Sequence, residues 1–137
     1  MKKDLFILAV LLHASLVQLR AQTLTLEVHN VKQPQGYLYA ALYDSQENFL
    51  KKPVAAFRVE ARDTTVVIPC QGLPAGEYAL SLFHDINGNG KLDTGRFGIP
   101  QEPYGFSNDA QGTMGPPSYK QCRFAFRKDT ILTVHLL

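Results

Sequence analysis

Apolar and polar residues alternate along most of the chain, a pattern that is typical of β-strands with one buried face. Five segments follow this period of two, namely 24–28, 65–70, 78–84, 122–126 and 131–136, and 54–59 is a further strand candidate. Segment 37–43 is apolar on both faces, as expected for a central strand. No segment has a clear helical period, although 45–52 is compatible with one helical turn capped by Ser45.

About seven short strands in a domain of this length predict an all-β fold, a two-layer antiparallel β-sandwich. Segment 86–119 departs from the two-residue period. It has no strand pattern and holds 7 of the 10 glycines and 4 of the 8 prolines. Such a stretch is usually functional or disordered, and its aromatic and apolar residues favour order. We therefore expect one long ordered loop, 86–119, whose Phe97, Ile99, Tyr104 and Phe106 pack back on the sandwich.

The N-terminus has the three parts of a secretory signal peptide. Lys2 and Lys3 form a basic start, 5–12 is an unbroken apolar run, and the small residue Ala21 precedes Gln22. The run is shorter than the roughly 20 residues of a membrane-spanning helix. We predict a signal peptide at 1–21, a single β-sandwich domain at 22–137 without a transmembrane anchor after cleavage, and a periplasmic, secreted or cell-surface location.

The charge argues against one class of partner. Residues 22–137 contain 11 basic and 11 acidic side chains, so the slightly positive charge of the chain comes from the predicted signal peptide. Because no basic stripe is available to follow phosphates, we expect no nucleic-acid binding.

The two cysteines, Cys70 and Cys122, both fall on the apolar phase of their predicted strands. An exported protein can hold a disulfide, whereas buried free thiols pack as small apolar residues. A disulfide requires Cα atoms within about 7 Å of each other, which a sequence does not determine. Of the two interpretations we favour buried free thiols.

One loop has the spacing of a calcium site. Calcium takes six to eight oxygen ligands, and an EF-hand loop supplies them from positions 1, 3, 5, 7 and 9. Gly90 at position 6 fits the sharp turn that such a loop needs. The residues at the five ligand positions are Asp85, Asn87, Asn89, Lys91 and Asp93, where Lys91 would use its backbone carbonyl.

The loop is not a complete EF-hand. Arg96 stands at position 12, where the pattern requires Glu, and Glu102 would substitute if the chain folds back. Such a site would be weak, with a Kd of about 10⁻⁴ to 10⁻³ M, as in extracellular modules. Two consecutive Asn-Gly pairs are also a strong turn signal, but a turn alone does not require Asp at both ends. We therefore expect calcium as a cofactor, with these ligands: Asp85, Asn87, Asn89, Lys91, Asp93 and Glu102.

Four segments resemble the bacterial exported family called domain of unknown function 2141: LPAGEYAL at 73–80, FHDINGNGKLD at 83–93, FGIPQEPYGFSN at 97–108 and GPPSY at 115–119. The resemblance covers nearly all of the chain after the signal peptide. It implies a sandwich similar to the transthyretin-like or carboxypeptidase-regulatory-like domains, so the fold class we expect is a seven-stranded antiparallel β-sandwich of the transthyretin or immunoglobulin kind. The family has no settled activity, and the resemblance implies fold and compartment more than function.

An enzyme is the less favoured interpretation. Ser107, His84 and Asp109 can be combined into a triad, but His84 lies on the apolar phase of its strand and no nucleophile-elbow pattern surrounds Ser107. Glu102 and Asp93 would suit glycoside chemistry but fit better as metal ligands. We expect an exported module of unknown physiological role that acts in binding or structure. A subunit or partner of a cell-surface or secretion assembly is the alternative, which an exposed edge strand would favour.

Overall fold

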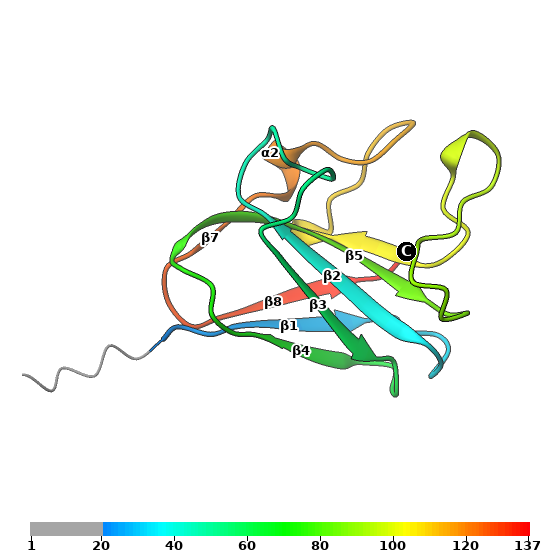
Figure 1. The fold of residues 1–137 in the computed structure, drawn as a ribbon, viewed down its shortest axis with the longest axis horizontal. Helices are drawn as coiled ribbons and strands as arrows, with labels where there is room; N and C mark the ends of the chain where they lie inside the picture. Colours follow the sequence, from blue (N-terminus) through cyan, green and yellow to red (C-terminus); the bar gives the residue numbers. More distant parts are fainter. Residues whose placement is uncertain (1–20) are drawn as a thin grey trace, which may run out of the picture.

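The computed structural model describes residues 21–137, so the predicted signal peptide lies, apart from Ala21, outside the described residues. Within this range the chain forms eight strands, one short α-helix and two single 3₁₀ turns (Figure 1). None of the helices in 21–137 has the length and apolarity to cross a bilayer. In chain order the elements are β1 (Leu24–His29), β2 (Tyr37–Tyr43), β3 (Ala55–Glu60), β4 (Val66–Cys70), β5 (Gly76–Asp85), η1 (Arg96–Gly98), β6 (Tyr104–Phe106), η2 (Ser107–Asp109), α2 (Tyr119–Cys122), β7 (Phe124–Phe126) and β8 (Thr130–His135).

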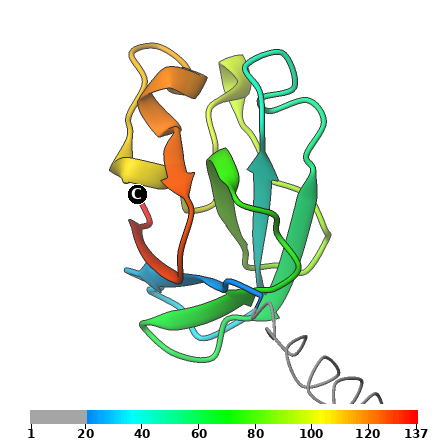
Figure 2. The same cartoon turned by 90° about the vertical axis from the view of Figure 1, so that its left-hand side faces the viewer.

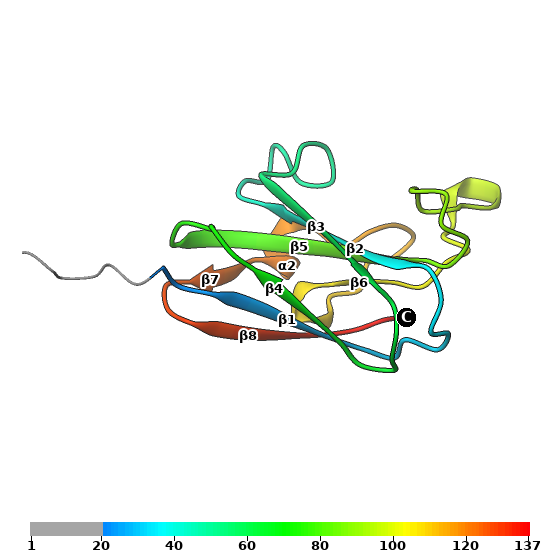
Figure 3. The ribbon, with the colours of Figure 1, turned by 60° about the horizontal axis from the view of Figure 1, so that its bottom comes forward.

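The strands form two sheets. The smaller has the order β4-β1-β8, and the larger has the order β3-β2-β5-β6, with β7 also paired to β5. Figure 3 shows them as two layers, with β1 and β8 in one and β2 and β5 in the other. The predicted all-β sandwich is therefore confirmed, with eight strands in place of about seven.

One pair of strands departs from the antiparallel prediction. β1 runs parallel to β8, with Leu24 beside Thr130 and His29 beside His135. A parallel pair cannot be joined by a tight hairpin, and these two strands come from opposite ends of the domain. The period of two is the same in both kinds of pairing, so the residue pattern does not distinguish them.

The core lies between the sheets, because the alternating apolar residues of each strand face the other layer. β1 illustrates this arrangement, since Leu24, Leu26 and Val28 are buried while Glu27 and His29 lie on the outer face. The other fully buried large side chains of this core are Val31, Leu38, Leu42, Ile68, Leu80, Phe126 and Val134. Loss of water from these side chains is the main source of the stability of the fold.

The predicted long loop is ordered, but only part of it packs on the sandwich. Phe106 is buried and Tyr104 is partly buried against a second apolar cluster. Phe97 is 97% exposed and Ile99 is 62% exposed, so for these two the packing prediction is wrong. They lie on a hairpin, closed by a bridge between Thr94 and Pro100, that projects away from both sheets (yellow-green in Figure 1). Both side chains are therefore left in solvent.

Helical structure differs from the prediction in two places. Segment 45–52 forms turns rather than a helix, although the Ser45 hydroxyl accepts the predicted bond from the backbone of Asn48 (3.3 Å). A real α-helix begins after Ser118, which forms a capping box with Gln121. The Ser-x-x-Gln spacing of this box indicates the start of a helix. The alternation of apolar and polar residues in 122–126 indicated a strand instead. Figure 2 shows α2 (orange) at the same end of the sandwich as the 45–52 turns.

Both cysteines are buried free thiols. Cys70 belongs to the main core, whereas Cys122 belongs to the second cluster and lies in α2, not in a strand as predicted. Burial raises the pKa of Cys70 to about 12 and that of Cys122 to about 11. Both thiols are therefore protonated at neutral pH and act as packing groups.

Candidate functional site

The candidate loop starts at the buried end of β5. Asp85, the last residue of that strand, is fully buried and pairs with Tyr37 at the start of β2. Gly36 precedes Tyr37 with a φ of +73°, and a Cβ at this position would collide with the backbone carbonyl of Asp85. The close approach of these two backbones fixes where the loop leaves the sheet.

The carboxylate of Asp85 closes the loop. Its two oxygens accept hydrogen bonds from the backbone N–H of Asn89 (3.2 Å) and of Gly90 (2.8 Å). Gly90 has a φ of +80°, a conformation that favours glycine. The glycine at position 6 thus forms the predicted sharp turn, and the aspartate at position 1 closes it, while the ligand role of Asp85 stays a prediction.

Two asparagines connect the loop to Asp93. The Oδ1 of Asn87 accepts from the Asn89 backbone (3.2 Å), and the Oδ1 of Asn89 accepts from the Lys91 backbone (3.1 Å). Their Nδ2 groups donate to the two oxygens of Asp93, at 2.6 Å from Asn87 and 2.7 Å from Asn89. These donors, Asn89 first and Asn87 second, hold the pKa of Asp93 below its ordinary value. The carboxylate is therefore ionised.

Glu102 folds back onto the loop. Its carboxylate is buried and accepts from the Ile86 backbone (2.7 Å) and the Asp93 backbone (3.0 Å). The return is guided by a hydrogen bond from the Gln101 backbone to the carbonyl of Asp93 (2.8 Å). Glu102 thus joins both ends of the loop, whereas Arg96, at the position of the EF-hand glutamate, is exposed in the projecting hairpin.

The predicted ligands lie in one connected network, but they do not surround a common point. Within residues 21–137, no three His, Cys, Asp or Glu side chains are grouped so that they could hold a metal ion. The carboxylates of Asp85 and Glu102 accept backbone N–H groups, while that of Asp93 is covered by two amides. A cation at this loop would have to replace those amide N–H groups on Asp93.

The residues of the possible catalytic triad lie in three separate environments. The Ser107 hydroxyl is buried, accepts from the Leu80 backbone (2.9 Å) and donates to the Cys122 carbonyl. The Nε2 of His84 lies 2.6 Å from the Gln35 carbonyl oxygen, while its Nδ1 is buried without a partner among the described residues. Asp109 binds His135, 26 residues away, a pair that no local sequence pattern indicates. Ser107, His84 and Asp109 are therefore not linked as a Ser-His-Asp relay.

Replacing Ser107 with alanine tests its structural role. The change leaves the Leu80 N–H and the Cys122 carbonyl without this partner, and a buried unsatisfied group costs about 1–3 kcal/mol. We expect the free energy of unfolding, measured by urea denaturation, to fall by about that amount. Ser118→Ala removes a hydroxyl of the same kind from an exposed helix cap, for which about 1 kcal/mol is expected. A Ser107 variant as stable as the wild type would contradict the hydrogen bonding described above.

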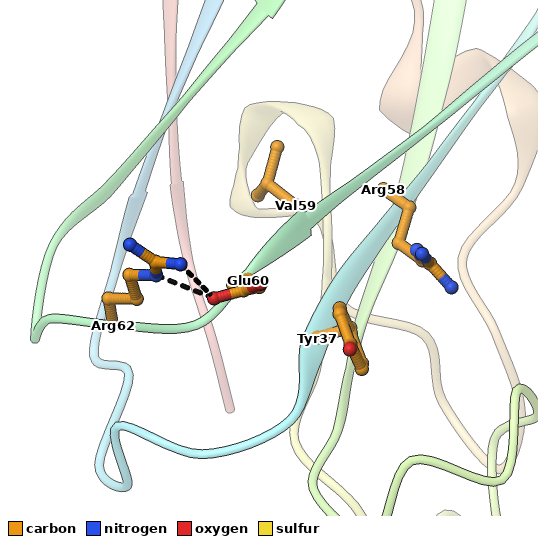
Figure 4. Close-up of a pocket in the computed structure, with 5 residues that line it drawn as sticks. All are labelled: Tyr37, Arg58, Val59, Glu60 and Arg62. Atoms are coloured by element: carbon orange, nitrogen blue, oxygen red, sulfur yellow. Dashed lines mark hydrogen bonds and ion pairs between the residues drawn. The ribbon is translucent and has the colours of Figure 1, made fainter.

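A shallow hollow beside β3 offers no reactive group. It is lined by Tyr37, Arg58, Val59, Glu60 and Arg62 (Figure 4). Arg62 bonds to Glu60 (2.6 Å), and the Arg58 guanidinium lies 4.5 Å from the centre of the Tyr37 ring. Its charged side chains are thus engaged with neighbours, and none of the residues that line it is a serine, cysteine or histidine.

Two of the edge strands, β3 and β4, carry features that resist strand addition. β3 presents Arg58 and Glu60 on its exposed face, and β4 contains Pro69, which has no N–H to donate. Charged residues and proline on edge strands are common protections against pairing with another chain. These edges do not favour the assembly alternative.

Comparison with known proteins gives one match. Residues 26–133 match the model of a family described as an uncharacterized protein conserved in bacteria, DUF2141. No curated protein and no solved structure matches the chain.

Proposed function

The chain belongs to this uncharacterised bacterial family, and we propose that it is an exported β-sandwich module that calcium stabilises at loop 85–93 and that acts in binding. One observation carries the proposal: Asp85 and Glu102 hold the backbone of the loop through hydrogen bonds, and the side chains at positions 3, 5 and 9 thereby lie in contact with one another. Ordering these groups is a large part of the cost of binding an ion.

The chemistry of the loop suits a hard cation. Asp93 is ionised, and among the described residues its carboxylate accepts from the side-chain amides of Asn87 and Asn89. Calcium prefers carboxylate and amide oxygens. Each amide oxygen now accepts one backbone N–H and keeps a second lone pair. Rotation of the amides would turn these oxygens toward an ion on Asp93, with the Lys91 carbonyl as a further donor.

A weak calcium site would suit an exported protein. A site with two asparagines and without the bidentate EF-hand glutamate at position 12 is expected to have a Kd of about 10⁻⁴ to 10⁻³ M, the range of extracellular modules. The N-terminal sequence predicts export, and such an affinity is useful only where calcium is abundant.

The projecting hairpin supports a binding role. Its backbone is held by a hydrogen bond from Gly95 to Ile99 (2.8 Å), and it presents Phe97 almost fully to solvent. The hairpin follows directly on Asp93 and returns to Glu102, so calcium at the loop would stiffen the base of the hairpin. An exposed aromatic residue on a rigid support is a common feature of protein-binding surfaces.

A thermal melt tests the proposal. Calcium at a hundredfold excess over its Kd should stabilise the fold by about 2.7 kcal/mol relative to EDTA, because it binds only the folded state. Asp85→Asn should abolish most of the rise in Tm. Asp44→Asn, at the other end of β2 from the loop, is the matched control and should retain it. Equal melting temperatures with and without calcium would remove the basis of the proposal.

Terbium luminescence can locate the ion. Terbium takes oxygen ligands as calcium does, and it is excited through nearby aromatic rings. The chain has no tryptophan, and the Tyr39 hydroxyl lies 3.9 Å from where a Cβ on Gly90 would be. Bound terbium should therefore emit through Tyr39, and calcium should quench this emission. Tyr39→Phe should lose most of it, whereas Tyr78→Phe, in the core, should not.

A further inference from the structure

A pair of histidines lies on the outer face of the smaller sheet, whereas loop 85–93 leaves from β5 of the larger sheet. His29 ends β1, His135 ends β8, and the parallel register places the two residues side by side. Their ring centroids are 5.1 Å apart, and the rings are tilted by 32°. Both side chains are partly open to solvent, with exposed fractions of 32% for His29 and 46% for His135.

Each histidine is oriented by its own carboxylate. Glu27 lies 2.6 Å from the Nε2 of His29, and Asp109 lies 2.7 Å from the Nδ1 of His135. The other oxygen of Asp109 accepts the backbone N–H of His135 (2.8 Å), so this carboxylate is fixed at two points. Asp109 is the last residue of η2, within the long loop. The loop therefore brings a carboxylate to β8, the edge strand of the smaller sheet.

The carboxylates determine which ring nitrogens have a lone pair. An ionised carboxylate only accepts hydrogen bonds, so in the neutral rings the proton sits on the Nε2 of His29 and the Nδ1 of His135. The remaining nitrogens, Nδ1 of His29 and Nε2 of His135, make no hydrogen bond within the described part of the chain. Each of these nitrogens is therefore available as a Lewis base.

We propose that His29 and His135 form a surface site for a divalent transition-metal ion of the zinc class. Imidazole nitrogen is a preferred ligand of Zn²⁺, Ni²⁺ and Cu²⁺, and a metal-bound histidine usually donates its other ring N–H to a carboxylate. Two adjacent rings supply two ligands, and water completes the coordination.

The site is distinct from the calcium loop in ligand chemistry as well as place. Calcium prefers oxygen ligands, and the histidine pair offers nitrogen. Zinc binding at the pair should therefore be unaffected by Asp85→Asn and by excess calcium.

Nitrogen NMR tests the proposal atom by atom. Two-bond ¹H–¹⁵N correlation spectra are recorded on protein purified without a polyhistidine tag while ZnCl₂ is added. We expect a single equivalent of zinc to shift the Nδ1 of His29 and the Nε2 of His135, while the carboxylate-bonded nitrogens keep their protons. His135→Gln should abolish the shift at His29.

Positioning and specificity are checked by two further variants. Asp109→Asn removes the charge that orients His135 and should lower the zinc affinity roughly 10–100-fold. Thr133→Ser, an exposed position on the same strand, should leave it unchanged. The proposal is overturned if neither unprotonated nitrogen shifts, if the shifts fall on the carboxylate-bonded nitrogens, or if a folded His135→Gln variant binds zinc as the wild type does.

Discussion

Replacing Phe126 with alanine lowers the free energy of unfolding by about 3–5 kcal/mol, the usual cost of removing a large buried aromatic ring. Phe126 is fully buried in the main core, and its ring centroid lies 6.4 Å from that of Tyr78. It belongs to β7, a three-residue strand that pairs only with the start of β5. The ring is fully buried, and its cost within that range depends on how far the neighbouring side chains collapse into the cavity.

The matched control for this prediction is Phe97→Ala, which removes the same ring from a position that is 97% exposed. Surface substitutions of this kind change stability by less than about 0.5 kcal/mol. Urea denaturation of both variants gives the comparison. Similar losses in the two would mean that Phe97 packs on the sandwich or that Phe126 does not, and either result would contradict the fold.

Replacing Glu102 with alanine is the second large effect, and it should appear even without calcium. The change leaves the N–H groups of Ile86 and Asp93 without their acceptor, at about 1–3 kcal/mol for each group. Measured by urea denaturation in EDTA, the loss reports on the hydrogen bonds alone. The same variant should also lose most of its calcium response, because the base of the loop is no longer held.

Glu47→Ala is the control for Glu102, since Glu47 is an exposed glutamate in the turns after β2. It should change neither the stability in EDTA nor the response to calcium. If Glu102→Ala were as stable as Glu47→Ala, the buried carboxylate would not be bracing the loop, and the geometry of the candidate site would be wrong.

The sequence predicted the strands well where a single physical cause decides the structure. Alternation in 24–28 and 78–84 reflects one face against the core, and these segments became β1 and β5. β6 was missed because its three residues, among them Gly105, are too few to show a period of two. Cys122 was misassigned because a four-residue helix depends on the Ser118 cap rather than on an apolar pattern.

Loop 85–93 shows which parts of a site can be predicted from the sequence. Spacing alone predicted that Asp85, Gly90 and Asp93 belong to one loop, because local turn geometry brings them together. Glu102 required the assumption that the chain folds back, and its bonds to both ends of the loop follow from the backbone around the hairpin. The pair of His29 and His135 had no local signal, since it arises from the parallel register of two strands that are far apart in the chain.

The most direct test of the central proposal is a calorimetric titration of the purified, calcium-free protein with calcium chloride. The proposal predicts one ion per chain with a Kd of about 10⁻⁴ to 10⁻³ M, loss of the heat in Asp85→Asn, and its retention in Asp44→Asn. A titration without heat, together with no calcium-dependent change in the NMR signals of Gly90 and Asp93, would contradict it.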